Sequence, residues 1–107
     1  MKPRYHKYGA QGGYYKGIYF PSKREMGRYK ELEIMEKVGM IKELAVHPRY
    51  GIRIHEREVC KVELDFVYCD KIGRRIYEDV KGFYTRESRL KHKLFEAYYG
   101  AKVTIVK

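Results

Sequence analysis

The sequence predicts a single α/β domain in which a mixed sheet is flanked by helices. Two segments show the three- and four-residue apolar spacing of helices, and apolar, β-branched runs lie between and after them. A chain of 107 residues is long enough for one modest core and too short for two. The expected order is α-β-β-β-α-β, and the long connection through the second helix makes the last strand parallel to a neighbour.

Residues 1–20 are rich in Gly, Tyr and Lys and show no sustained period. They are expected to form a basic, largely irregular arm that closes with a short extended piece at residues 17–20. The interleaved cations and tyrosines suit contacts with phosphates and stacking on bases. A disordered tail, or one exchanged between subunits, is an equally open alternative. Residues 21–107 are expected to form the single domain.

A first helix is expected over residues 23–38. Ser22 and Glu25 have the spacing of a capping box, and Gly39 stops the run. The apolar positions of this helix are Met26, Tyr29, Leu32, Met35 and Val38.

Three strands are expected to follow this helix. The run "LAVHPRYGIRI" is interrupted by Pro48 and Gly51, which indicates a strand at a sheet edge or with a bulge. The run "VCKVELDFVYC", residues 59–69, is expected to be one long strand. A turn at Gly73 then returns the chain as the antiparallel partner "RIYEDVKG".

A second helix and a last strand complete the predicted order. Thr85 is the expected cap, Gly100 the stop, and "KVTIVK" the final strand. The predicted apolar face of this helix consists of Leu90, Leu94, Ala97 and Tyr98.

The chain is strongly basic. It carries 24 Lys and Arg against 14 Asp and Glu, a net charge of +10 with pI near 9.6. This imbalance favours a polyanionic partner, above all nucleic acid, over the alternative of a solvated basic surface without function. No apolar run approaches the ~20 residues of a membrane helix, so no membrane role is expected. The basic N-terminus lacks the apolar core of a signal peptide, so secretion is not expected either. Cys60 and Cys69 are expected to be reduced thiols.

The segment around residues 65–81 combines two acids with a lysine. Strand alternation places Asp79 and Lys81 on one side, and Glu78 and Val80 on the other. Asp65 lies in an apolar segment, where a carboxylate is costly unless it has a partner or a metal. The hairpin brings Asp65 towards Asp79, and such a group can hold Mg²⁺, or Mn²⁺, for phosphodiester hydrolysis.

These residues resemble a known superfamily. The pattern "LDFVYCD…YEDVKG" resembles the core of the PD-(D/E)XK nucleases. The segments "KYGA…GIYFPSKREMGRYKEL", "HPRY", "DFVY", "EDVKG" and "KHKLFEAYYGAKVTIV" together resemble small phage and prophage resolvase-like nucleases of that superfamily, over nearly the whole chain. The resemblance implies a restriction-endonuclease-like α-β-β-β-α-β core and Mg²⁺-dependent cleavage of DNA, with Holliday-junction-resolvase-like enzymes among its relatives.

The resemblance also implies roles for individual residues. Asp65 and Asp79 match the metal-binding acids, with the main-chain carbonyl of Val80 as a further ligand. Lys81 matches the catalytic lysine. Glu25 matches a first-helix glutamate that completes the metal site, although a capping box alone also explains it.

Other positions have weaker or open assignments. His47 stands where relatives are expected to carry Gln, which leaves its role open. Glu78 is expected to bond a helix residue or a backbone amide on the face away from the metal. The candidate nucleic-acid contacts are Lys7, Lys16, Lys23, Arg28, Lys91 and Lys93.

The sequence therefore predicts a Mg²⁺-dependent DNA endonuclease acting on branched DNA such as Holliday junctions, in phage recombination or replication. A symmetric junction needs two cuts, so a homodimer is expected. The enzyme would work in the cytoplasm of a bacterial host and be encoded by a phage or prophage. The alternatives are a non-catalytic nucleic-acid-binding module on the same fold, and cleavage of RNA.

Overall fold

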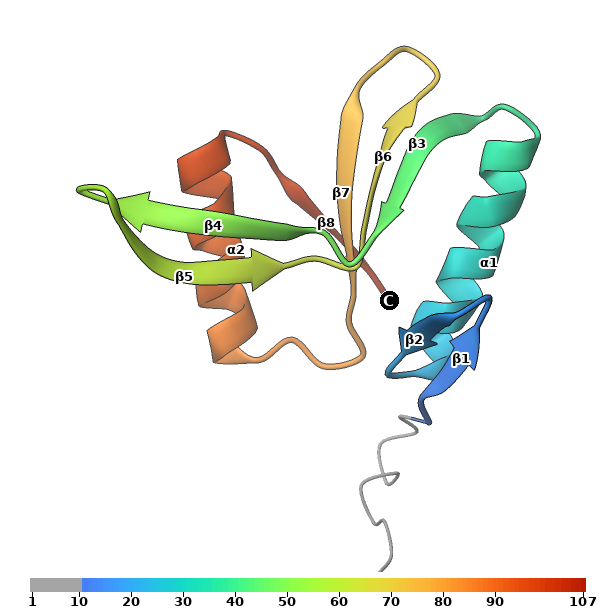
Figure 1. The fold of residues 1–107 in the computed structure, drawn as a ribbon, viewed down its shortest axis with the longest axis horizontal. Coiled ribbons are helices and arrows are strands. Elements are labelled where there is room, and N and C mark those ends of the chain that lie inside the picture. The colour runs from blue at the N-terminus through green and yellow to red at the C-terminus, as the bar shows by residue number, and fades with distance from the viewer. Residues whose placement is uncertain (1–10) are drawn as a thin grey trace, which may run out of the picture.

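The computed structural model describes residues 11–107, in which two helices and eight strands form a mixed α/β domain (Figure 1). The elements are β1 (Gly13–Tyr15), β2 (Ile18–Phe20), α1 (Lys23–Lys37), β3 (Ile41–Val46), β4 (Arg49–Ile54), β5 (Arg57–Glu63), β6 (Phe66–Asp70), β7 (Arg75–Val80), α2 (Arg86–Tyr99) and β8 (Val103–Val106).

The central sheet has four strands in the order β3-β6-β7-β8. β6 is antiparallel to both of its neighbours, and β8 is parallel to β7 because α2 carries the chain back between them. The turn between β6 and β7 contains Gly73 at φ 91°, as its glycine predicts. The predicted mixed sheet with a parallel last strand is confirmed.

The two helices lie on opposite faces of this sheet (Figure 1). α1 and the β1-β2 hairpin cover one face around a core of Phe20, Leu32 and Phe66. On the other face, α2 packs with the β4-β5 hairpin around Ile52 and Phe95. Because strand side chains alternate, neighbouring residues of β6 and β7 contribute to different cores.

Residues 59–69 do not form one strand, contrary to the prediction. The chain bends between β5 and β6 at Leu64 and Asp65, and the paired segment between β3 and β4 bends at His47 and Pro48. Two hydrogen bonds join the bends, from His47 N–H to Asp65 O at 2.9 Å and from Leu64 N–H to Pro48 O at 3.0 Å. The result is a bent two-stranded ribbon whose base belongs to the central sheet and whose tip is the β4-β5 hairpin.

The expected interruptions of the first strand are present. Pro48 separates β3 from β4, and β3 lies at the edge of the central sheet. Register shifts occur in both strands, between Lys42 and Ala45 and between Ile52 and Arg53. Proline and irregular pairing at an edge strand match the predicted bulged edge.

Both helices begin at the expected caps. Ser22 Oγ accepts the Glu25 N–H at 3.1 Å, and Thr85 Oγ1 accepts the Ser88 N–H at 3.0 Å. α1 ends at Lys37, one residue before the predicted end, and Gly100 ends α2 at φ 66°.

The buried face of α2 differs from the prediction. Its buried residues are His92 and Phe95, whereas Leu90 is 59% and Tyr98 is 47% exposed. The apolar pattern did not indicate this face because His92 is polar and was not counted as a buried position. Its ring can be buried because both nitrogens have hydrogen-bond partners. Of the predicted face, Leu94 does pack against the core with Phe95, whereas Leu90 and Tyr98 face outward.

The predicted irregular arm is partly structured. Residues 13–20 form the β1-β2 hairpin, and Phe20 is fully buried against α1. Lys7 and the rest of residues 1–10 lie outside the described part of the chain. Within residues 11–107, neither helix is long and apolar enough to cross a membrane. Cys60 and Cys69 are free thiols, as expected, although on two strands rather than one.

Candidate metal centre

Glu25 reaches the site from the first turn of α1. Ser22 caps the helix through the Glu25 N–H, but the Glu25 carboxylate does not complete a capping box. It turns instead to His47, with 2.6 Å between Glu25 Oε2 and His47 Nε2. The carboxylate is buried, with 5% of the residue exposed. The Glu25 N–H thus takes part in the helix cap, while the Glu25 side chain belongs to the candidate metal centre.

His47 and Asp65 occupy the two bends of the ribbon. The hydrogen bond between their backbones fixes them side by side. One ligand-type atom from each of Glu25, His47 and Asp65 lies within 4.8 Å of the other two. Two carboxylates and an imidazole at such spacing can hold a divalent cation. His47 has φ 55°, an uncommon backbone conformation that the bend imposes on this residue.

Asp65 is tied to β7 at both its backbone and its side chain. Its Oδ2 accepts the Val80 N–H at 2.6 Å, and its own N–H donates to Asp79 Oδ1 at 2.9 Å. Burial and the nearby Asp79 carboxylate raise the pKa of Asp65 to about 8. Ionised carboxylates buried this close together repel each other, and a cation beside them would relieve that repulsion.

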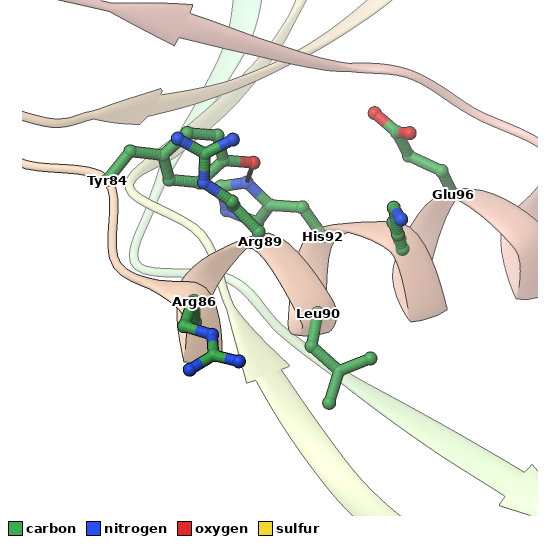
Figure 2. Close-up of a pocket in the computed structure, with 7 residues that line it drawn as sticks. Tyr84, Arg86, Arg89, Leu90, His92 and Glu96 are labelled. Atoms are coloured by element: carbon green, nitrogen blue, oxygen red, sulfur yellow. Dashed lines mark hydrogen bonds between the residues drawn. The ribbon is translucent and has the colours of Figure 1, made fainter.

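Asp79 faces α2 and is held by His92. His92 Nε2 lies 2.6 Å from Asp79 Oδ2, and His92 Nδ1 lies 2.6 Å from the Tyr84 hydroxyl (Figure 2). Because a carboxylate only accepts, we assign the ring hydrogen to Nε2, and Nδ1 then accepts from Tyr84. Lys81 Nζ is 3.5 Å from the same Asp79 oxygen. A fixed carboxylate with an adjacent lysine therefore stands next to Asp65.

Glu78 lies on the opposite face, as alternation predicts. Arg28 of α1 binds it with two hydrogen bonds, Nε to Oε1 at 2.9 Å and Nη2 to Oε2 at 2.7 Å. The Tyr68 hydroxyl also donates to Glu78. The bonds to Glu78 raise the pKa of the Arg28 guanidinium. Arg28, predicted to contact nucleic acid, is instead engaged inside the protein by Glu78 and, at its outer edge, by Glu31.

The structure brings together most of the predicted site. Glu25 and Asp65 share the metal-ligand group, while Asp79 and Val80 adjoin it through their hydrogen bonds to Asp65. His47, whose role the sequence left open, is the third member of the group. His92 was missed, and its only signal was a histidine one helical turn before Phe95 on the helix that follows Lys81.

The predicted nucleic-acid contacts have different surroundings. Lys23 is exposed at the start of α1, and Lys16 pairs with Glu33 at 2.8 Å. Lys91 lines a hollow that also contains Asp79 and Lys81. Lys93 lines a second hollow on α2, with Tyr84 and Arg89.

Comparisons with known proteins place the chain in one family. No curated protein and no solved structure matches it. The model of the family described as "Protein of unknown function (DUF1064)" matches residues 5–107. This match spans almost the entire sequence, and the chain therefore belongs to the DUF1064 family.

Proposed function

We propose that this chain is a divalent-metal-dependent DNA endonuclease with the restriction-endonuclease-like core of the PD-(D/E)XK superfamily. It hydrolyses phosphodiester bonds in branched DNA such as Holliday junctions, during phage recombination or replication. Its place of action is the cytoplasm of a bacterial host, and its gene belongs to a phage or prophage.

The observation that carries the proposal is the convergence of Glu25, His47 and Asp65 beside Lys81. Three ligand-type side chains from three separate segments meet within 4.8 Å. Buried carboxylates without compensating charge are costly, so their gathering favours a metal site over chance. An adjacent lysine is the remaining group that phosphodiester hydrolysis uses.

The order of the elements supports the proposed core. Without the two small hairpins, the chain runs α1, β3, β6, β7, α2, β8, with β8 parallel to β7. This is the α-β-β-β-α-β order that the sequence resemblance implies. Asp65 directly precedes β6, and Asp79 is the second-last residue of the antiparallel β7. The two acids therefore lie at the same end of the sheet.

The chain's own groups divide the chemistry between them. Glu25 and Asp65 would hold a divalent ion, with the Val80 carbonyl as a further proposed ligand. The ion would supply Lewis-acid activation of the scissile phosphate and of a coordinated water. Asp79 holds the Asp65 backbone through its 2.9 Å hydrogen bond. Lys81 orients the attacking water or neutralises charge that grows on the phosphate.

The donor set bears on the choice of ion. Carboxylate and carbonyl oxygens suit Mg²⁺, whereas the imidazole of His47 adds a nitrogen donor that Mg²⁺ rarely takes. Mg²⁺ is the ion proposed from the acids, and Mn²⁺ is the second candidate because it accepts both donor types. Branched DNA fits a small basic protein, since shape and backbone charge suffice for its recognition.

A cleavage panel tests the proposal. Purified protein is incubated with a four-way junction, a flap, single-stranded DNA and linear duplex, in Mg²⁺, in Mn²⁺ and in EDTA. We expect metal-dependent cutting with preference for a branched substrate. Asp65→Ala is expected to abolish cutting while DNA binding persists. Glu56→Ala, which removes an exposed acid in the β4-β5 turn, is the matched control and should cut normally.

Three results would contradict the proposal in different ways. Unchanged cutting by Asp65→Ala would remove the metal centre from the mechanism. DNA binding without cutting in either metal would favour the non-catalytic binding module. Faster cutting of a matched RNA duplex would reassign the substrate.

A further inference from the structure

A hollow of about 410 Å³ opens next to the candidate metal centre, between the base of the β4-β5 hairpin and the first turns of α2. Four cations from four segments line it. They are Arg49 at the start of β4, Lys61 of β5, Lys81 after β7 and Lys91 of α2. Only Lys81 and Lys91 were expected functional positions from the sequence, so the hairpin contributes two cations that no motif indicated.

The hollow adjoins the candidate metal centre through Asp79. Asp79 lines the hollow and accepts the Asp65 N–H, and Lys81, which also lines it, lies 3.5 Å from Asp79. A polymer held at Lys81 by one of its phosphates therefore has its next positions in, or directly beside, this hollow. A small isolated anion would need only Lys81, whereas a wall of cations on each side suits a continuous strand.

Three of the four cations have partners at the surface, whereas Lys81 lies 3.5 Å from the buried Asp79. Arg49 is 3.2 Å from Glu63, Lys61 is 3.5 Å from Glu58, and Lys91 is 3.5 Å from Glu87. Glu87 is 78% exposed, and both members of the Arg49 pair are also largely exposed. Exposed pairs of this kind contribute little, so these cations can turn to a phosphate at small cost.

The second hollow on α2 has a different character. Figure 2 shows Arg86 and Leu90 on one side of the helix start, and Arg89 with Tyr84 on the other. Arg89 lies 4.9 Å from the centre of the Tyr84 ring, which holds it by a cation–π contact. Neither Lys81 nor Asp79 lines this hollow.

We propose that the hollow lined by Arg49, Lys61, Lys81 and Lys91 is a phosphate-binding groove for the DNA strand on one side of the cleavage site. Arg49 and Lys61 form the hairpin wall, and Lys91 forms the α2 wall. The β4-β5 hairpin, which lies outside the four-stranded sheet, is thereby the part of the fold that holds the substrate strand. That the bound polyanion is DNA rests on the proposed function.

The test measures binding without cleavage. Fluorescence anisotropy of a labelled four-way junction and a labelled duplex is recorded in EDTA over a range of salt concentrations. The double variant Arg49→Ala/Lys61→Ala is compared with Lys71→Ala/Lys102→Ala, which removes the same charge from exposed positions away from the groove. All four are exposed positions, and thermal melting verifies that both proteins fold.

We expect the groove variant to bind at least tenfold more weakly at moderate salt. Its plot of log K against log salt should lose about 0.9 in slope for each lost phosphate contact, or roughly 2 in all. The control variant should change binding less than twofold. Equal losses in both variants, or wild-type binding by the groove variant, would overturn the groove.

The outcomes separate the groove from the nuclease. Groove-dependent DNA binding in a protein that never cuts would overturn the proposed function and leave the groove standing. Metal-dependent cutting together with wild-type binding by the groove variant would overturn the groove and leave the proposed function standing. Tighter groove-dependent binding of a matched RNA duplex would overturn the assignment to DNA.

Discussion

Two adjacent acids, Glu78 and Asp79, have opposite surroundings because a strand sends successive side chains to opposite faces. Glu78 is 2% exposed and bound by Arg28 and Tyr68 on the α1 side. Asp79 is 3% exposed and bound by His92 on the α2 side, next to Lys81. Glu78 is neutralised by Arg28 within the protein, whereas Asp79 lies beside the proposed metal site and lines the proposed phosphate groove.

Substitution of these two acids should separate stability from activity. Glu78→Gln removes the charge that Arg28 pairs with, and we expect the free energy of unfolding to fall by about 2–3 kcal/mol. This is at or below the low end for a broken buried pair, because Arg28 can still reach solvent and Glu31. Asp79→Asn keeps the shape and is expected to reduce cleavage about 100-fold with little change in stability.

Urea denaturation and single-turnover cleavage of a junction measure the two effects. The pair of variants controls for itself, since each removes one charge from neighbouring positions on one strand. A stable Glu78→Gln protein without activity, beside an active but unstable Asp79→Asn, would reverse the assignment of the two faces.

The sequence was sufficient for those site residues whose positions follow from strand alternation or a helix cap. Asp79, Lys81 and the opposite face of Glu78 came from period-2 alternation, and Glu25 and Asp65 from the motif. His47 and His92 depend on geometry that has no local signature. His47 meets Glu25 only because the ribbon bends, and His92 meets Asp79 only through the rotation of α2.

At the scale of elements, the first turn of α1 connects helix stability to the metal centre. Ser22 Oγ binds the Glu25 N–H, so the cap fixes the residue whose carboxylate meets His47. Ser22→Ala is expected to cost about 1 kcal/mol, the usual loss of a cap. It should also weaken Mn²⁺ binding, because the first turn that carries Glu25 frays.

Thermal melting and isothermal titration calorimetry with Mn²⁺ measure these two effects. Ser22→Thr keeps the side-chain oxygen and should restore both values. If Ser22→Ala lowered the melting temperature and left Mn²⁺ affinity at the wild-type level, the cap would have no part in placing Glu25.

The bent ribbon marks the limit of element prediction from this sequence. Residues 59–69 have strand-forming composition throughout, and a straight strand and a bent pair produce the same local pattern. Leu64 is fully buried and packs with the β4-β5 hairpin and α2, whereas Phe66 packs with α1. Tertiary packing therefore decides where the strand divides, and the bend is what places Asp65 beside His47.

At the scale of the whole molecule, the described residues contain one candidate metal group per chain. A symmetric four-way junction presents two equivalent scissile phosphates on opposing strands. One centre can cut only one of them at a time, so under the proposed function we expect two copies related by a two-fold axis on one junction. Each copy carries a net charge of +10, so two copies repel each other, and a DNA substrate bound by both would offset that repulsion.

A supercoiled plasmid that extrudes a cruciform tests this requirement. A dimer bound to the cruciform makes both cuts within the lifetime of one complex, and it converts supercoiled plasmid directly to linear product. A monomer makes one cut, the supercoiling is released, the cruciform is reabsorbed, and nicked circles accumulate. We expect linear product as the main species, together with a two-chain mass for the junction complex in EDTA by sedimentation. Mixing wild-type protein with excess Asp65→Ala should shift the product to nicked circles, since mixed dimers carry one working centre. Linear product that is insensitive to this mixing would contradict the paired arrangement.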